Sequence, residues 1–315
     1  MELKNCRQSF GETLRELGGA DPNIVVLEAD LGKSTMSEMF RQAYAQRYFQ
    51  VGIAEQNMTS MAAGLALTGK TAFTNSFAVF ATGRAYDQIR SSVCIPRLNV
   101  KICGSSAGLS DYGDGKTHQS IDDIALMRVL PGMTVFSPVD AVETAKIVRA
   151  MADIKGPCYL RLNRNDMPVY VDPDEEYKIG KLRMLREGSD AVVFATGIMV
   201  SKALKAAEDL QKEGVSVRVV SVSTIKPLDA QALKGYCRGV RAVVTSEEHN
   251  VHGGLGSAIC EALSMERLPI AIHGIEDSFG YSAENYELLL EKFNLTPEGV
   301  ARKVRLALSA PQGTA

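Results

Sequence analysis

The sequence predicts an α/β protein of two domains, each built around a parallel sheet. Its 315 residues exceed what one average hydrophobic core holds, which favours two domains. The hydrophobic content of 45% and charged content of 23% are those of an ordinary globular protein. Short apolar runs also alternate with stretches of helical period along the chain, a pattern typical of β-α-β units.

The first domain is expected to span residues 1–170. Its expected strands are rich in β-branched and aliphatic residues and comprise Ile24–Leu27, Ala72–Ser76, Leu98–Cys103, Met133–Phe136 and Cys158–Leu162. The stretches with helical spacing between them are Gln56–Leu67, Thr82–Val93 and Val142–Met151.

An acidic stretch with a proline, Asp172–Glu176, indicates a linker over residues 171–188. The second domain, residues 189–315, repeats the alternation. Its expected strands are Ala191–Ala195, Val215–Val222, Arg241–Thr245 and Ile270–His273. Its expected helices are Ser201–Glu213, Tyr286–Phe293 and Pro297–Leu308, before a short tail at Ser309–Ala315.

Composition and charge exclude several classes of protein. The net charge of −2, with both signs spread along the chain, does not favour nucleic acid or an acidic membrane as a partner. The six cysteines are scattered without a C-x-x-C pair, so buried thiols in a reducing compartment are expected. The first residues lack the apolar segment of a signal peptide, and a cytoplasmic protein is expected.

A glutamate and two aromatics follow neighbouring strands. Glu55 opens the helix expected at Gln56–Leu67, where a carboxylate commonly complements the dipole and caps free N–H groups. Phe77 and Phe80 follow the strand expected at Ala72–Ser76 and could simply pack in the core. Because ligands of open parallel sheets bind beyond the C-terminal ends of the strands, both segments are also candidates for a binding site.

A glycine-rich loop, Gly113–Gln119, carries Asp114 and His118. Glycines on both sides of an aspartate indicate a loop, and a histidine on a loop is a candidate functional residue because it exchanges protons near neutral pH. The Gly-Asp-Gly run could also open a metal-diphosphate site, but such a site needs an asparagine further downstream. The corresponding window, Ser137–Glu143, has none, so we expect no metal site here.

Two other segments leave alternatives open. Arg161 and Arg164 flank the end of an expected strand, where guanidinium groups could bind a phosphate or carboxylate or form a surface salt bridge. The glycines of Gly253–Gly256 lack the spacing of a nucleotide-binding fingerprint. A tight turn packed against another subunit is the favoured interpretation of that segment.

The order of these motifs is more specific than any one of them. The ordered segments are Ala29–Leu31, Gly52–Gln56, Ser76–Phe80, Asp114–Gln119, Arg164, Glu247–His249 and Gly253–Gly256. Together they resemble the pyrimidine-binding and C-terminal domains of transketolases, over essentially the whole chain. The resemblance implies a first domain with a parallel sheet covered by helices on both faces. 1-Deoxyxylulose-5-phosphate synthases share most of the pattern, including Arg84–Gln88, and 2-oxoacid dehydrogenase β subunits share the second domain.

The resemblance implies thiamine diphosphate as coenzyme and assigns four residues to it. Glu55 matches the glutamate that shares a proton with N1′ of the aminopyrimidine ring and so promotes formation of the ylid. Phe80 matches the stacking aromatic, with Phe77 beside it, and Asp30 matches an aspartate near the coenzyme and the subunit interface. Gly83 stands where family members often have a further aromatic, so one pocket wall is altered.

On the substrate side, the resemblance implies that His118 contacts the donor hydroxyls as a catalytic proton donor and acceptor. Asp114 would read the hydroxyl configuration, and Arg164, Arg7 and Ser34 would bind the sugar phosphate.

One departure concerns the donor sugar. Transketolases carry another histidine upstream of the Asp114 loop, where this chain reads Cys103–Gly108, and the connection from Gly108 to Asp114 is slightly longer. The identity of the donor ketose is therefore left open.

The resemblance implies an enzyme subunit that is active only with a partner. The chain lacks the N-terminal diphosphate-binding domain, so a partner subunit is expected to supply it together with Mg²⁺ or Ca²⁺. The pair would transfer a two-carbon ketol unit from a ketose (phosphate) to an aldose as a heterotetramer with two copies of each chain. The alternatives are a subunit of a deoxyxylulose-phosphate-synthase-like or other 2-oxoacid-decarboxylating enzyme, and a scaffold without catalysis, which the presence of Glu55 and Phe80 disfavours.

Overall fold

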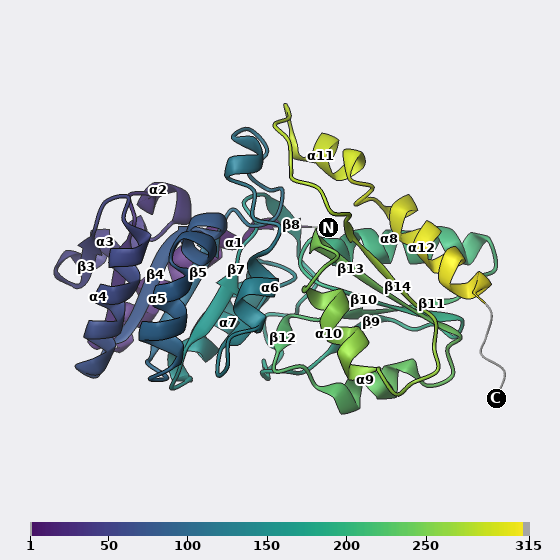
Figure 1. Ribbon diagram of the computed structural model, residues 1–315, viewed down its shortest axis with the longest axis horizontal. Helices are drawn as coiled ribbons and strands as arrows, with labels where there is room; N and C mark the ends of the chain where they lie inside the picture. The colour runs from purple at the N-terminus through teal and green to yellow at the C-terminus, as the bar shows by residue number, and fades with distance from the viewer. Residues whose placement is uncertain (1, 311–315) are drawn as a thin grey trace.

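The computed structural model describes residues 2–310 and contains two sheets of mainly parallel strands, side by side in Figure 1. This confirms the α/β fold class expected from the alternating pattern. From residue 311 on, the expected C-terminal tail lies outside the described residues.

The first sheet has seven strands. In spatial order they are β12 (Thr224–Lys226), β6 (Thr134–Phe136), β7 (Cys158–Arg161), β5 (Val100–Ser105), β4 (Thr71–Phe77), β2 (Ile24–Glu28) and β3 (Tyr48–Gln50). All neighbours are parallel except β12 and β6. Successive residues of β2 point to opposite faces, so Ile24 and Val26 enter one hydrophobic cluster and Val25 and Leu27 another.

Helices cover both faces of this sheet. They are α1 (Cys6–Ala20), α2 (Gly32–Thr35), α3 (Glu38–Ala43), α4 (Glu55–Leu67), α5 (Tyr86–Gln88), α6 (Asp123–Arg128) and α7 (Ala141–Asp153). Residues of α1 and α7 belong to the cluster with Ile24, whereas residues of α4 and α6 belong to the cluster with Val25. Asn5 and Asp140 cap α1 and α7 by accepting hydrogen bonds from backbone N–H groups of the first turn.

The second sheet has five strands. Their order is β14 (Ile270–Ile275), β13 (Ala242–Asn250), β10 (Ala191–Ala195), β11 (Val217–Ser221) and β9 (Arg183–Arg186), and β9 alone is antiparallel to its neighbour. The helices of this part are α8 (Met199–Lys212), α9 (Ala230–Cys237), α10 (Leu255–Ala262), α11 (Tyr286–Lys292) and α12 (Pro297–Ser309). Strand β9 falls inside the range 171–188 that the sequence marked as a linker.

Several short elements tie distant parts of the chain together. Strand β12 follows β11 in the chain but pairs with β6 of the first sheet. Strand β1 (Leu3–Asn5) pairs antiparallel with β8 (Asp166–Pro168).

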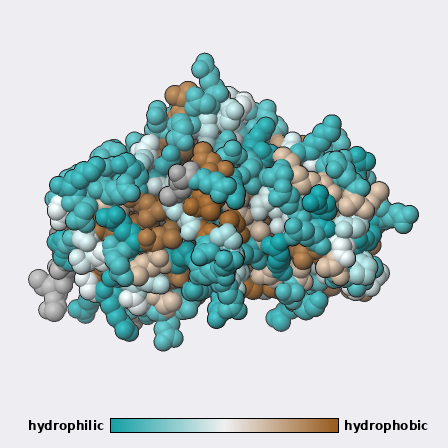
Figure 2. All heavy atoms as spheres, turned by 180° about the vertical axis from the view of Figure 1, so that it is seen from behind, coloured by the Kyte–Doolittle hydropathy of each residue, from teal (hydrophilic) through white to brown (hydrophobic). Residues whose placement is uncertain are grey.

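Figure 2, the opposite side of the molecule, shows a largely hydrophilic surface with apolar residues gathered near its middle.

The helix expected at Thr82–Val93 is interrupted. π-Helical turns span Phe80–Arg84 and Ile89–Cys94, with the short α5 between them. π-Helical turns occur frequently at functional sites, because they change the direction of the side chains that follow. The departure from a regular helix is therefore a structural indication of a functional site in this segment.

All six cysteines are free thiols, and five are buried, as expected from their apolar surroundings. Among the described residues, no helix is both long and apolar enough to cross a bilayer.

The buried carboxyl of Glu143 should make stability depend on pH. It lies on α7, accepts a hydrogen bond from the Val139 N–H (2.8 Å), and burial raises its pKa from 4.5 to about 7. Since the folded state holds this proton more tightly than the unfolded chain, the stabilisation is complete below about pH 4.5 and is lost as the pH rises through about 7. Glu143→Gln, which stays neutral, should gain up to about 3 kcal/mol of unfolding free energy relative to wild type over that interval.

Urea unfolding at several pH values measures this difference. Glu291→Gln, a change at an exposed carboxylate on α11, is the control and should show no such trend. A pH-independent difference for Glu143→Gln would contradict the expectation.

Candidate functional site

Glu55 is the first residue of α4, and only 1% of its surface is exposed. Its carboxylate receives hydrogen bonds from the Arg84 guanidinium (3.0 and 3.2 Å) and from the Ser76 hydroxyl (3.4 Å). The residue at the cap position, Ala54, supplies no side-chain cap. Because these partners are side chains from other elements, capping of the helix does not account for a buried carboxylate at this point.

Two aromatic rings and a histidine gather beside Glu55. The rings of Phe77 and Phe80 are 6.3 Å apart and nearly parallel, at 17°. The His118 imidazole meets the Phe80 ring edge-on at 5.1 Å and the Phe77 ring at 6.3 Å. The Arg84 guanidinium lies 4.4 Å over the Phe80 ring and reaches Glu55 from there. Four of the residues expected at the site are thus brought together, with Arg84 as the link.

The path of the chain explains this convergence. Phe77 is the last residue of β4, and Phe80 begins the π-helical turn that ends at Arg84. Ser76, one residue before Phe77, points to the Glu55 side of the sheet. The site therefore lies at the C-terminal end of a central parallel strand, where binding sites of such sheets form.

The loop with Asp114 and His118 contains a single 3-10 turn, Gly115–Thr117. Asp114 is exposed and His118 half-buried, with its Nδ1 2.9 Å from the Thr117 hydroxyl. Gly115 has a φ of +74°, and a Cβ there would clash with the Ser282 hydroxyl. The glycine is thus required both by its backbone angle and by the close approach of the segment before α11.

Arg7, Ser34 and Arg164 also lie together. The Arg7 guanidinium donates to the backbone carbonyls of Ser34 (2.7 Å) and Arg164 (3.0 Å), and Arg164 pairs with Asp111 (2.9 Å). Burial raises the pKa of Asp111 and Arg164 opposes this, while Asp114 exerts a weaker raising influence. Asp111 thus connects the arginine cluster to the loop of residues 108–119, which we call the substrate loop because the family resemblance assigns its Asp114 and His118 to the substrate.

Asp30 shares a hydrogen-bonding partner with the segment before Glu55, because the Gln50 side-chain oxygen accepts from the N–H groups of both Asp30 and Gly52. It follows β2 with a φ of +64°, and its N–H donates to the Gln50 side chain (2.9 Å). It lines an open hollow of about 360 Å³ together with Lys33, Ser34 and Arg41. In the part of the chain that the structure describes, no hydrogen bond or ion pair joins the Asp30 side chain to Glu55.

Arg161 belongs to a buried network and is neither a phosphate ligand nor part of a surface salt bridge. Its Nε donates to Asp123 (2.9 Å) and its Nη2 to the carbonyl of Glu248 (2.7 Å). The Glu248 carboxyl, on β13 of the second sheet, accepts from the Leu109 N–H and the Tyr286 hydroxyl, both at 2.7 Å. This network joins the substrate loop to the second sheet.

The glycines before α10 make room for another carboxylate. The Glu247 carboxyl accepts from the N–H groups of Leu255 and Gly256, both at 2.7 Å, and a Cβ on Gly254 would clash with it. The segment is therefore a helix-capping turn within the chain. Its expected contact with another subunit stays a prediction.

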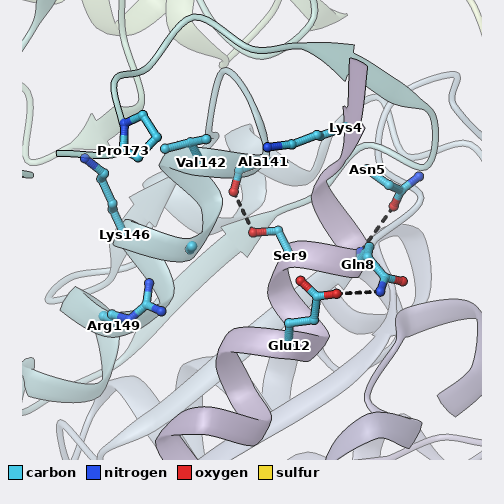
Figure 3. A pocket seen from close by; sticks show the side chains of 11 residues that line it. Lys4, Asn5, Gln8, Ser9, Glu12, Ala141, Val142, Lys146, Arg149 and Pro173 are labelled. Atoms are coloured by element: carbon cyan, nitrogen blue, oxygen red, sulfur yellow. Dashed lines mark hydrogen bonds between the residues drawn. The ribbon is translucent and has the colours of Figure 1, made fainter. Parts of the chain in front are cut away.

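A further open hollow of about 540 Å³ lies between α1 and α7, away from Glu55 (Figure 3). Its lining includes Lys4, Glu12, Lys146 and Arg149, and Ser9 spans the two helices by donating to the Ala141 carbonyl (2.6 Å). It contains none of the residues expected at the site.

Comparison with protein families identifies both parts of the chain. Residues 3–169 match the model of the transketolase pyrimidine-binding domain, and residues 180–300 match that of the transketolase C-terminal domain. The chain belongs to the transketolase family. The resemblance inferred from the order of motifs is thereby confirmed.

Relatives similar over nearly the full length include separate transketolase subunits. A Methanocaldococcus jannaschii protein, whose name assigns it to a transketolase C-terminal section, is 43% identical over 96% of this chain and 95% of its own length. A 6-deoxy-6-sulfo-D-fructose transketolase subunit from a Clostridium species is 40% identical over 94% of this chain and 92% of its own. These relatives support the transketolase interpretation over the synthase alternative.

A solved structure of a split transketolase shares the fold of the chain. The chain superimposes on a split gene transketolase, an inactive β4 tetramer, with a TM-score of 0.87 and 46% identity over 97% of this chain and 98% of the other.

Gly108 tests the contact between the substrate loop and the second sheet of this transketolase subunit. Its φ is +66°, and an added Cβ would clash with the Glu248 carboxyl. Gly108→Ala should therefore lose about 1–3 kcal/mol of stability, measured by urea unfolding. Gly113→Ala, in the same loop but with no atom within 4 Å of its ideal Cβ, should lose much less. Equal losses for the two variants would refute this account of the contact.

Proposed function

We propose that this chain forms the pyrimidine side of the active site in a two-chain transketolase that transfers a two-carbon ketol unit from a ketose (phosphate) to an aldose. The observation that carries the proposal is the buried Glu55 carboxylate beside the paired rings of Phe77 and Phe80, in a chain of the transketolase family. The length match to relatives named as separate sections or subunits supports a two-chain enzyme.

The residues present fit the family's coenzyme, thiamine diphosphate. The flat guanidinium of Arg84 already lies on the Phe80 ring and donates to both oxygens of Glu55, so a flat nitrogen-bearing ring fits the same place. Glu55 would hold N1′ of the aminopyrimidine, and Phe80 and Phe77 would flank the ring. When bound, the coenzyme supplies the carbon nucleophile for cleavage of the ketose.

The substrate would meet His118 and Asp114 next to the coenzyme. The His118 imidazole lies against both aromatic rings and is half-buried, which suits a group that takes and returns the proton of a donor hydroxyl. The exposed Asp114 would bind the neighbouring hydroxyl. Arg164, with Arg7 and Ser34 behind it, would bind the phosphate end of the sugar, and the phosphate would compete with Asp111 for the guanidinium.

The diphosphate and its Mg²⁺ or Ca²⁺ would be bound by the partner subunit, and Asp30 would face that interface. We propose a heterotetramer of two copies of each chain, because a shared site requires both and closed symmetry favours it. The inactive β4 tetramer of the split gene transketolase supports self-association of this type of subunit without activity. The six free thiols fit a reducing compartment such as the cytoplasm.

Reconstitution tests the two-chain proposal. The purified chain with thiamine diphosphate and Mg²⁺ should show no two-carbon transfer between sugar phosphates. Addition of the diphosphate-binding subunit should produce transfer, measured by chromatography of the products. Activity of this chain alone would refute the proposal, and CO₂ release from pyruvate by the mixture would favour the synthase alternative.

Replacement of Glu55 tests its role at the coenzyme. Glu55→Gln keeps the size of the side chain but cannot give a proton to N1′, so kcat of the reconstituted enzyme should fall by about 10²–10⁴-fold. Circular dichroism and urea unfolding should report a folded protein. Asp87→Asn, at an exposed carboxylate on α5, should leave kcat unchanged. Turnover of Glu55→Gln near the wild-type rate would contradict the proposed role.

A further inference from the structure

Arg84 makes two specific contacts at the site, although the sequence assigned it no role. Its guanidinium donates to both oxygens of Glu55, at 3.0 and 3.2 Å, and covers the Phe80 ring at 4.4 Å. The two ends of this ion pair differ in exposure: 1% of the Glu55 side chain is exposed, against 46% of the Arg84 side chain. The carboxylate is fixed in the site, whereas the arginine reaches it from the surface.

Stacking on an aromatic ring and hydrogen bonding to a carboxylate are also the two contacts that the coenzyme ring would make at this site. A guanidinium is planar, stacks on aromatic faces and directs N–H groups at a carboxylate. An aminopyrimidine is also planar, and on the proposed function it stacks on Phe80 and forms a hydrogen bond with Glu55. The ring and the guanidinium cannot hold the same face of Phe80 and the same carboxyl at once.

We infer that Arg84 occupies the place of the aminopyrimidine ring in the coenzyme-free subunit and is displaced when the coenzyme binds. This inference rests on the proposed function of Glu55 and Phe80. In the free subunit, Arg84 compensates the charge of a buried carboxylate, which would be costly to leave unpaired. Coenzyme binding therefore includes the breaking of an ion pair, and Arg84 lowers the affinity for the coenzyme.

The surroundings of Arg84 allow it to leave. Within residues 2–310, Glu55 and Phe80 are the partners that the guanidinium contacts by ion pair, hydrogen bond or stacking. Its neighbour Gly83 has no atom within 4 Å of its ideal Cβ, so the space beside the π-helical turn is open. Rotation of a half-exposed side chain toward solvent needs no change in the core.

Binding of thiamine diphosphate to the two-chain complex tests the inference without reference to activity. The dissociation constant is measured by isothermal titration calorimetry with excess Mg²⁺ and no sugar. Arg84→Ala removes the competing group, so the coenzyme should bind about three- to tenfold more tightly than to wild type. Arg84→Lys keeps a charge but not the flat face, and its dissociation constant should lie between the two.

Arg90→Ala, a change at an exposed arginine on the following π-helical turn, is the matched control and should bind like wild type. Circular dichroism and urea unfolding confirm that each variant is folded. If Arg84→Ala fails to fold, the Arg84→Lys comparison decides.

An unchanged or weaker affinity in the folded Arg84 variants would overturn the inference while leaving the proposed function intact. Absence of coenzyme binding to the wild-type complex would instead overturn the proposed function, and the inference with it. A second measurement uses the full chain alone with thiamine, observed by saturation-transfer NMR. The Arg84→Ala chain should give a stronger ring signal than wild type, and an equal or weaker signal would count against displacement.

Discussion

The buried carboxyl of Glu248 is the interaction on which the arrangement of the site depends. It stands on β13 of the second sheet, yet it accepts hydrogen bonds from the Leu109 N–H of the substrate loop and from the hydroxyl of Tyr286, the first residue of α11. Burial raises the pKa of this carboxyl to about 7, and the nearby Arg161 opposes that rise. A buried carboxyl without partners is strongly destabilising, so Glu248 needs the hydrogen bond from Leu109. The position of the loop therefore depends on the second sheet, which carries Glu248.

The central strands of the fold could be predicted because the local sequence alone, a short apolar run between turns, indicates a buried strand. The strands β2, β4, β5, β6 and β7 carry apolar residues on both faces and are bounded by turns, as buried parallel strands should be. The short strands β3, β9 and β12 could not be predicted in this way. Strand β12 forms because Thr224–Lys226 passes the open edge of β6 after nearly ninety residues of intervening chain.

The residues of the site also fall into two groups, those that a local motif identifies and those whose role depends on partners distant in sequence. Glu55, Phe77, Phe80 and His118 could be assigned because each stands in a short motif of the transketolase resemblance, and the fold brings these motifs together. Arg84 and Asp111 could not be assigned, because their importance lies in partners distant in sequence. Arg161 was ambiguous for the same reason, because its buried partner Glu248 lies on a strand of the second sheet, far away in the sequence.

The two sides of the site are therefore held by different parts of the chain. Glu55 and the rings depend on the first sheet and on the π-helical turn that follows β4. The loop with Asp114 and His118 depends also on the second sheet, through Glu248 and through the close approach of Ser282 to Gly115. Changes in β13 should thus disturb the position of Asp114 and His118 more than that of Glu55 and the two aromatic rings. A chain that lost its second sheet would keep the Glu55 carboxylate in place and lose the contacts that hold the Asp114–His118 loop.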